Sequence, residues 1–334
     1  MSKTRGRDLL KIIPGLLISG FFLWFTFHKI SFAEIRELHF ASPLWIVGVV
    51  GFTFASYSLR CVRWAAMMRG ARASLKTCAR VLLVSQAANN ILPLRIGDVM
   101  RCFTYADDLG ASPSVILSTV ILEKLLDIFI LVLLFVAFMG PGVSAHSRVL
   151  AETMLGVSAT GLLVLLLGAP RLEGPVRALF QRLPQTGLFA KAEHWLLLAI
   201  DCLRQIGVPG SLLLLVQSAV IWACEGMIYV SGAKALGFVT DSIGAWQAVS
   251  IANLSYLIPS SPGAIGTFEW AVRAAYVSHG AEPAQAAVFG IALHAWLLVS
   301  VTGVGGVVFL AHRIATHNRK PLLGEIESLP PELP

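Results

Sequence analysis

The sequence has little charge and lacks the short motifs that mark common enzyme classes. Charged residues make up 13% of its 334 residues, whereas hydrophobic residues make up 56%. Soluble domains carry about 25% charged residues, so this composition predicts a polytopic membrane protein. The absence of P-loop, GxSxG and HExxH motifs argues against ATPase, hydrolase and metalloprotease functions. The longest polar connection, about residues 171–210, is too short for a second catalytic domain.

Cysteine is also scarce, and the five cysteines form no CxxC pair. We therefore expect neither structural disulfides nor a zinc site, and no cofactor. The net charge of +7 does not indicate a nucleic-acid partner, because membrane proteins concentrate Lys and Arg in their cytoplasmic loops. The cysteines are Cys61, Cys78, Cys102, Cys202 and Cys224.

Apolar runs predict an all-α bundle with about six full spans, near residues 12–27, 44–59, 115–139, 150–167, 212–230 and 284–310. The first run resembles a signal sequence, with a small-residue cleavage site at Ser31-Phe32-Ala33. We favour an uncleaved helix, because Trp24 lies near its end and more spans follow.

Basic clusters set the predicted topology. Four cations precede residue 12, and further clusters follow at about 60–80, 171–204 and 312–320. The positive-inside rule then places both termini in the cytoplasm. Residues 195–203 fit either an amphipathic surface helix or a solvated linker. Residues 1–315 would form a single membrane domain, followed by a disordered, Pro- and Glu-rich tail at 316–334.

Residues 89–101 break the helical pattern between two spanning segments. This stretch holds two amides, a proline, a glycine, two arginines and an aspartate. Irregular backbone at membrane depth is tolerated only inside protein or beside a water-filled cavity. We therefore interpret this stretch as one wall of a polar cavity.

A second broken stretch echoes the first. Asn90 with Pro93-x-x-Ile96-Gly97-Asp98 resembles Asn253 with Pro262-x-x-Ile265-Gly266, followed by Glu269. The predicted topology requires residues 80–114 to begin and end on the cytoplasmic side and residues 234–283 to begin and end on the outer side. Each region would then be a pair of short segments that enters and leaves the membrane from the same face. Such pairs are typical of a transporter site between inverted repeats, although full hairpins satisfy the same parity.

Nine ionisable residues are predicted at membrane depth, and each would cost about 2.5–3.5 kcal/mol if it faced lipid. We expect Lys124 to pair with Asp127, and Arg95 or Arg101 to neutralise Glu123 and Asp127, which share a helix face. A purely structural ion network and a functional relay both explain such groups. Burial favours a protonated carboxyl, so proton coupling at a carboxylate is an open alternative. The nine are Arg95, Asp98, Arg101, Glu123, Lys124, Asp127, Glu225, Glu269 and Arg273.

The arginines favour an anionic ligand, because guanidinium groups bind phosphate well. Arg60, Arg63, Arg95 and Arg101 are expected around the cytoplasmic entrance, although Arg60 and Arg63 equally fit topology and lipid anchoring. The turn 259–266 can aim backbone N–H groups at an anion. Gly303, Gly305 and Gly306 are expected to pack helices closely.

Four motifs together resemble the lysylphosphatidylglycerol synthase/flippase transmembrane-domain family over about residues 10–315. They are Arg60-x-x-Arg63-Trp64, Asn90-x-x-Pro93-x-Arg95-x-Gly97-Asp98-x-x-Arg101, Glu123-Lys124-x-x-Asp127 and Ile258-Pro259-x-x-Pro262-Gly263-x-x-Gly266-x-x-Glu269. The resemblance implies a protein of the bacterial inner membrane that moves lipids between leaflets. The aminoacyltransferase domain of the namesake has no counterpart here, so we expect a stand-alone flippase-like protein and no synthase activity.

We therefore expect a non-enzymatic translocase for an anionic, aminoacylated, polyprenyl-phosphate-linked or hopanoid-type lipid, with lipid-synthesis enzymes as further candidate partners. Arg95 and Arg101 would contact phosphate, and Asn89, Asn90 and Asn253 would donate hydrogen bonds. A membrane glycosyl- or lipid-transferase and an assembly scaffold are the alternatives. The predicted site comprises Arg60, Arg63, Asn89, Asn90, Pro93, Arg95, Gly97, Asp98, Arg101, Glu123, Lys124, Asp127, Glu225, Asn253, Pro259, Pro262, Gly263, Gly266 and Glu269.

Overall fold

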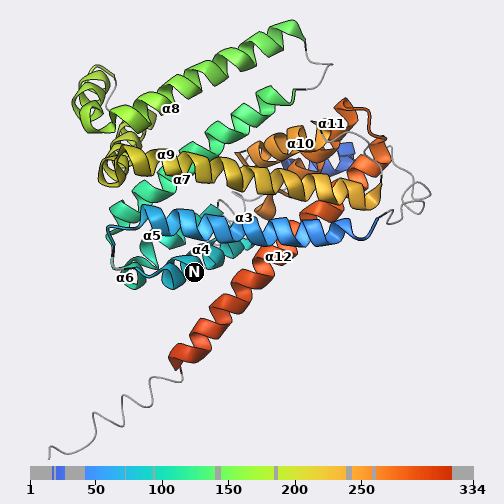
Figure 1. Cartoon of the computed structure of the whole chain (residues 1–334), viewed down its shortest axis with the longest axis horizontal. Helices are drawn as coiled ribbons and strands as arrows, with labels where there is room; N and C mark the ends of the chain where they lie inside the picture. Colours follow the sequence, from blue (N-terminus) through green and yellow to red (C-terminus); the bar gives the residue numbers. More distant parts are fainter. Residues whose placement is uncertain are drawn as a thin grey trace, which may run out of the picture.

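The computed structural model describes residues 17–18, 20–26, 42–71, 73–92, 95–139, 144–183, 187–237, 243–257 and 261–317, and these contain helices and no strand (Figure 1). The helices are α3 (Trp45–Met67), α4 (Leu75–Ile91), α5 (Ile96–Phe103), α6 (Ala106–Leu109), α7 (Pro113–Ala137), α8 (Ala145–Phe180), α9 (Leu188–Leu236), α10 (Ile243–Leu254), α11 (Thr267–Ser278) and α12 (Pro283–His317), with the short 3₁₀ turns η2 (Ser255–Leu257) and η3 (Pro262–Ala264). The all-α prediction is confirmed.

Four described helices are long and apolar enough to cross a membrane, namely α3, α9, α12 and the 151–169 part of α8. Helix α7 has 25 residues, about 37 Å at ~1.5 Å per residue, but carries Glu123, Lys124 and Asp127 along its length. The first predicted span, near residues 12–27, lies partly outside the described residues. Its residues 20–26 are helical, and the Phe22 ring lies 5.0 Å from the Trp270 ring of α11.

Local sequence signals explain where several helices begin and end. Ser74 accepts a hydrogen bond from Thr77 N–H at the start of α4, and Ser112 accepts one from Val115 N–H at the start of α7. These caps satisfy backbone donors that have no partner within the helix. Gly237 ends α9 in the left-handed conformation that glycine adopts most readily.

Most of the described residues in the connection 171–210 are helical, which includes residues 195–203 and excludes the solvated-linker alternative for them. Helix α8 continues to Phe180 and α9 begins at Leu188, with a kink at Gly207 (φ 73°) followed by Pro209. Charged side chains pair within α8 and between α8 and α9 in this region. Glu173 lies 3.1 Å from Arg177 and 2.8 Å from Arg204, and these guanidinium groups lower the pKa of that carboxyl.

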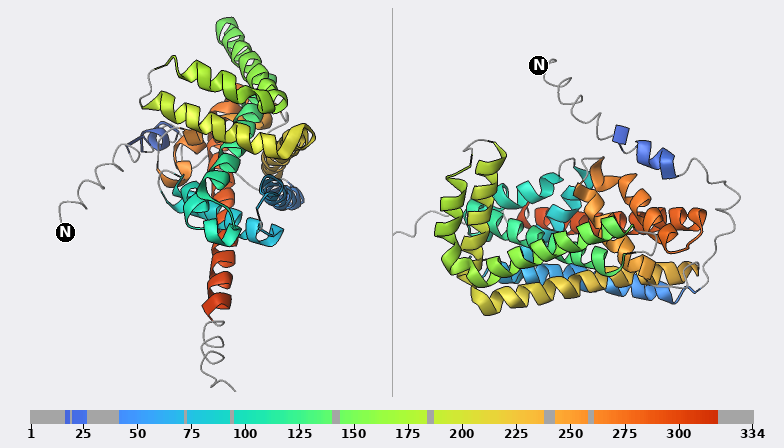
Figure 2. Two further views of the ribbon diagram at one scale, coloured as in Figure 1. Left: turned by 90° about the vertical axis from the view of Figure 1, so that its left-hand side faces the viewer. Right: turned by 90° about the horizontal axis from the view of Figure 1, so that it is seen from above.

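The two halves of the chain pack in the same order (Figures 1 and 2). Helix α3 packs on α4 and α4 on α5, while α9 packs on α10 and α10 on α11. Across the halves, α4 packs on α12 and α10 packs on α7, and the long helices α3 and α9 lie side by side. This reciprocal pattern supports the predicted repeat and brings the two broken stretches together, since η3 contacts α4.

Close backbone approach at Gly97 holds the first short pair together. A Cβ atom at Gly97 would overlap the Ser85 carbonyl oxygen and crowd Asn89 of α4. Gly305 has the packing role predicted for it, because a Cβ there would lie 2.6 Å from the Ala87 Cβ of α4. Gly303 and Gly306 have open space around them, so the packing prediction is wrong for these two residues.

Replacement of Gly97 by alanine should separate α5 from α4. Overpacking of this kind costs about 1–3 kcal/mol, because backbone rather than a flexible side chain must move. The thermal unfolding temperature of the purified protein in detergent should fall for Gly97→Ala and should not fall for the control Gly303→Ala, where a Cβ meets no atom and alanine favours the helix. Equal unfolding temperatures for the two variants would contradict this account of the α4–α5 contact.

Candidate functional site

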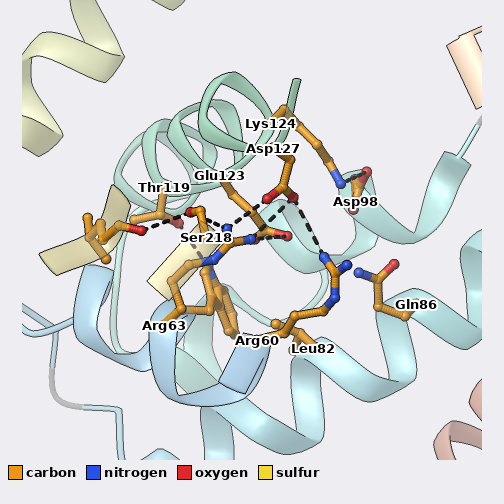
Figure 3. Close-up of polar contacts among 12 residues, drawn as sticks. Arg60, Arg63, Leu82, Gln86, Asp98, Thr119, Glu123, Lys124, Asp127 and Ser218 are labelled. Atoms are coloured by element: carbon orange, nitrogen blue, oxygen red, sulfur yellow. Dashed lines mark hydrogen bonds and ion pairs between the residues drawn. The ribbon is translucent and has the colours of Figure 1, made fainter. Parts of the chain in front are cut away.

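Two arginines on α3 contact carboxylates on α7 and α9, and Figure 3 shows their contacts with Asp127 of α7. Arg63 holds Asp127 with two hydrogen bonds, Nη1 to Oδ1 at 2.7 Å and Nη2 to Oδ2 at 3.2 Å. Arg60 donates from Nη2 to Glu225 Oε1 at 3.1 Å, and its Nη1 lies 3.7 Å from Asp127 Oδ2. Ser56 adds a hydrogen bond to Glu225 at 2.8 Å. These contacts join α3, α7 and α9 through buried charge-assisted bonds.

Arg101 of α5 is completely buried and pairs with Glu123 of α7. Its Nη1 donates to Glu123 Oε2 at 2.8 Å and its Nε donates to Ser85 Oγ at 3.1 Å. The guanidinium carbon also lies 4.9 Å from the Trp64 ring centroid. This arginine, Glu123 and Ser85 therefore fasten α4, α5 and α7 together.

Asp98 is shared by three cations at the end of this network. Lys124 Nζ lies 3.5 Å from Oδ2, Arg95 Nε lies 3.7 Å from Oδ2, and Arg101 Nη2 lies 3.5 Å from Oδ1. Asn89 fixes this carboxylate by donating from Nδ2 to Oδ1 at 3.1 Å and accepting from the Asp98 N–H at 3.1 Å. None of the three ion pairs with Asp98 is short, and two of the three cations, Arg95 and Lys124, are partly exposed.

Several predicted pairings are wrong. Lys124 pairs with Asp98, not with Asp127, although the latter lies three residues away on its own helix. Arg101 neutralises Glu123 as predicted, but Arg63 rather than Arg95 neutralises Asp127. Arg60 and Arg63 lie inside the bundle instead of at its entrance, because their side chains find carboxylate partners there.

The network borders a polar cavity of about 330 Å³, within the size range of ligand pockets. Its wall brings together most of the predicted residues of α4, α5 and α7 with Glu225 of α9 and Asn253 of α10. The charged and amide residues that line it are Arg60, Gln86, Asn89, Asn90, Arg95, Asp98, Lys124, Asp127, Glu225 and Asn253. Arg63, Arg101 and Glu123 lie behind this wall and hold it in place.

The network as a whole contains one more cationic side chain than carboxylates, and its close pairings leave this excess beside Asp98. In the described part of the chain it joins five cationic side chains to four carboxylates, namely Arg60, Arg63, Arg95, Arg101 and Lys124 against Asp98, Glu123, Asp127 and Glu225. The excess lies on Arg95 and Lys124, whose side chains are 43% and 31% exposed. Both sit beside Asp98, so the cavity is suited to one further anionic group.

The predicted residues of the second half do not all reach the cavity. Glu269 caps α11 by accepting a hydrogen bond from Gly266 N–H at 2.6 Å, and its other oxygen lies 2.7 Å from His294 Nδ1. Gly263 lies close to the first half instead, since a Cβ there would be 3.3 Å from the Asn90 carbonyl oxygen. Pro262 begins the turn η3. Pro93 and Pro259 lie outside the described residues.

Sequence reasoning missed the aromatic part of the wall and the partner of Glu269. Tyr57, Trp222 and Tyr256 line the cavity, and His294 was left without a role. Tyr57 and Trp222 stand three residues before Arg60 and Glu225, which places each on the same helix face as a predicted charge. That spacing was a usable signal for both aromatic residues. Tyr256 and His294 carried no such signal.

These features define an integral membrane protein with a charged cavity between broken helices. The model of the family described as "Lysylphosphatidylglycerol synthase TM region" matches residues 12–305. The chain belongs to this family, which confirms the resemblance. No curated protein and no solved structure matches the chain. Membership suggests a membrane role connected with lipids, and it leaves the substrate and the mechanism to be established.

Removal of one partner from the Arg101–Glu123 pair should destabilise the fold strongly. Arg101→Leu leaves a buried carboxylate, which costs about 3–5 kcal/mol, whereas an apolar replacement of both partners is often neutral. Thermal unfolding should therefore show a large loss for Arg101→Leu and substantial recovery for Arg101→Leu with Glu123→Leu. If the double variant is as unstable as the single one, the pair is not a local structural clamp.

The backbone conformation at Arg95 should lower the stability of the folded protein. Its φ of 54° lies in the left-handed region, which a side chain with a Cβ rarely adopts. Glycine relieves this strain, so Arg95→Gly should unfold at a higher temperature than Arg95→Ala, by about 1 kcal/mol in stability. The two variants lack the same guanidinium, so the comparison isolates the backbone. A lower unfolding temperature for Arg95→Gly would contradict the strain.

Proposed function

We propose that this protein is a lipid translocase whose cavity accepts a lipid head group while the hydrocarbon chains stay in the bilayer. The observation that carries the proposal is the positive excess on Arg95 and Lys124 at a cavity inside an apolar helix bundle. Charge at membrane depth is expensive and is usually functional. A structural network alone needs no cavity and no exposed cations.

The proposed ligand group is a phosphate or another lipid-borne anion. Arg95 and Lys124 bind it, and the anion takes over from Asp98 as their counter-ion. The cavity amides of Asn89, Asn90 and Asn253 line the same space and supply hydrogen-bonding groups. Arg101 does not contact the ligand in this arrangement, because Glu123 already occupies its guanidinium.

The proposed topology follows from the basic clusters and places both termini in the cytoplasm of a bacterial inner membrane. In this proposal α4–α5 and α10–α11 are re-entrant pairs from opposite faces, which meet where η3 contacts α4. Rearrangement of the broken segments near residues 93 and 259 alternates access to the head group. Without a nucleotide motif in the sequence, transport is downhill or ion-coupled.

A transferase function is less well supported by the site. A general base must be able to accept a proton from the reacting group. Asp127 and Glu225, the cavity carboxylates nearest the aromatic wall, are each engaged by an arginine instead. The protein is therefore proposed to move its lipid without changing it covalently.

Loss of Arg95 or Lys124 should stop transport and leave the protein folded. Purified full chain in liposomes with fluorescent phosphatidylglycerol is assayed for leaflet exchange, and lipid extracts are checked by mass spectrometry. We expect exchange by the native chain, at least a tenfold loss of rate for Arg95→Ala and for Lys124→Ala (about 1.4 kcal/mol or more), and no new lipid species.

The matched control is Arg177→Ala, which removes an exposed arginine from α8 far along the chain from the cavity. Its exchange rate should equal that of the native chain. Native rates in both cavity variants would refute the head-group site. New covalent lipids would identify a transferase instead.

A further inference from the structure

A second hollow lies directly beside the polar cavity and is almost entirely apolar. It has a volume of about 530 Å³ and is lined by residues of α3, α4 and α12. Helix α4 packs against both α3 and α12 and therefore forms its floor. The rim is open, since Phe54 is 76% exposed and Val304 is 50% exposed. We refer to this hollow as the side groove.

The side groove and the polar cavity adjoin one another. Tyr57 of α3 and Val301 of α12 line both spaces. On α4 the two spaces occupy one helix face, with Leu75, Ala79 and Leu83 in the groove, followed by Gln86 and Asn90 in the cavity. This spacing of three to four residues forms a stripe about 22 Å long, apolar at one end and polar at the other.

Polar atoms in the groove are turned away from its surface. The Thr53 hydroxyl donates to the Val49 carbonyl at 2.7 Å and accepts from the Trp296 indole N–H at 3.0 Å. Ser300 donates to the Leu297 carbonyl of its own helix at 3.3 Å. The groove therefore presents hydrocarbon to its occupant and gives water no good partners.

We infer that the side groove holds one hydrocarbon chain of the lipid whose head group occupies the polar cavity. This inference rests on the proposed function and extends it to a diacyl or prenyl lipid substrate. An amphiphile needs a charged compartment joined to an apolar one, and these two spaces share a border at Tyr57 and Val301. The groove between α3 and α12 is then the side opening through which the chain stays in contact with the bilayer.

Filling the groove with a large side chain tests this inference. Val304→Trp inserts an indole into the groove, whereas Val299→Trp places the same residue on an exposed face of the same helix outside it. The probe is phosphatidylglycerol with a photoreactive diazirine on one acyl chain, incorporated in liposomes with the purified full chain. Labelled peptides are mapped by mass spectrometry, and leaflet exchange is measured in parallel.

The native chain should be labelled at groove positions of α3, α4 and α12. Val304→Trp should lower both this labelling and the exchange rate about tenfold, and Val299→Trp should leave both within about twofold of native. Ala79→Phe fills the groove from α4 and should lower labelling and exchange in the same way. Agreement between the two variants would show that the losses do not come from a folding defect in Val304→Trp alone. Size-exclusion profiles check the folding of all variants.

The outcomes separate this inference from the proposed function. If Arg95→Ala loses exchange but both groove-filling variants keep native exchange and labelling, the chain site is refuted and the translocase stands. If the native chain exchanges no lipid but Val304→Trp still lowers labelling of the groove, the translocase function is refuted and the binding site for the hydrocarbon chain is supported. Labelling that is equal at the groove and at residue 299 indicates bulk lipid only and refutes the chain site.

Discussion

The paired arginine–carboxylate network is the interaction on which the rest of the structure depends. Each of its charges would cost about 2.5–3.5 kcal/mol against lipid, so each helix that carries them is less stable alone in the membrane than in the bundle. Arg63 with Asp127, Arg60 with Glu225 and Arg101 with Glu123 remove this penalty only when α3, α5, α7 and α9 are assembled. The network thus makes formation of the bundle and formation of the cavity wall one event.

The proposed function depends on the two cations, Arg95 and Lys124, that the network does not fully neutralise. In the buried pairs of the network, each carboxylate has an arginine partner. Arg95 and Lys124, by contrast, share the single carboxylate of Asp98 and line the cavity. Arg95 is also held in a strained backbone conformation next to the break in the helix. Strain and incomplete neutralisation both raise the energy of the empty site, and an anion that binds there recovers part of it. The neighbouring apolar groove gives the same ligand a place for its chain.

Sequence patterns identified the charged residues of the site but predicted several of their ion-pair partners wrongly. Lys124 and Asp127 are neighbours on one helix, yet Asp98 of α5 takes the lysine because packing brings it within reach. The basic residues Arg60 and Arg63 follow a long apolar run, which resembles a cytoplasmic boundary, but α3 continues to Met67 and buries both. Residues 171–210 looked like a loop because they are polar, but most of them are helical, and Glu173 of α8 pairs with Arg204 of α9.

The sequence by itself determined the all-α membrane fold, the family, the two broken stretches and most residues of the cavity wall. These follow from hydropathy, from proline and glycine positions and from the cost of charge in lipid, which act locally along the chain. Tertiary structure alone decided which arginine neutralises which carboxylate, that His294 of α12 pairs with Glu269 of α11, and that an apolar groove adjoins the cavity. Such contacts depend on the distances between helices far apart in sequence, and no local periodicity encodes those distances.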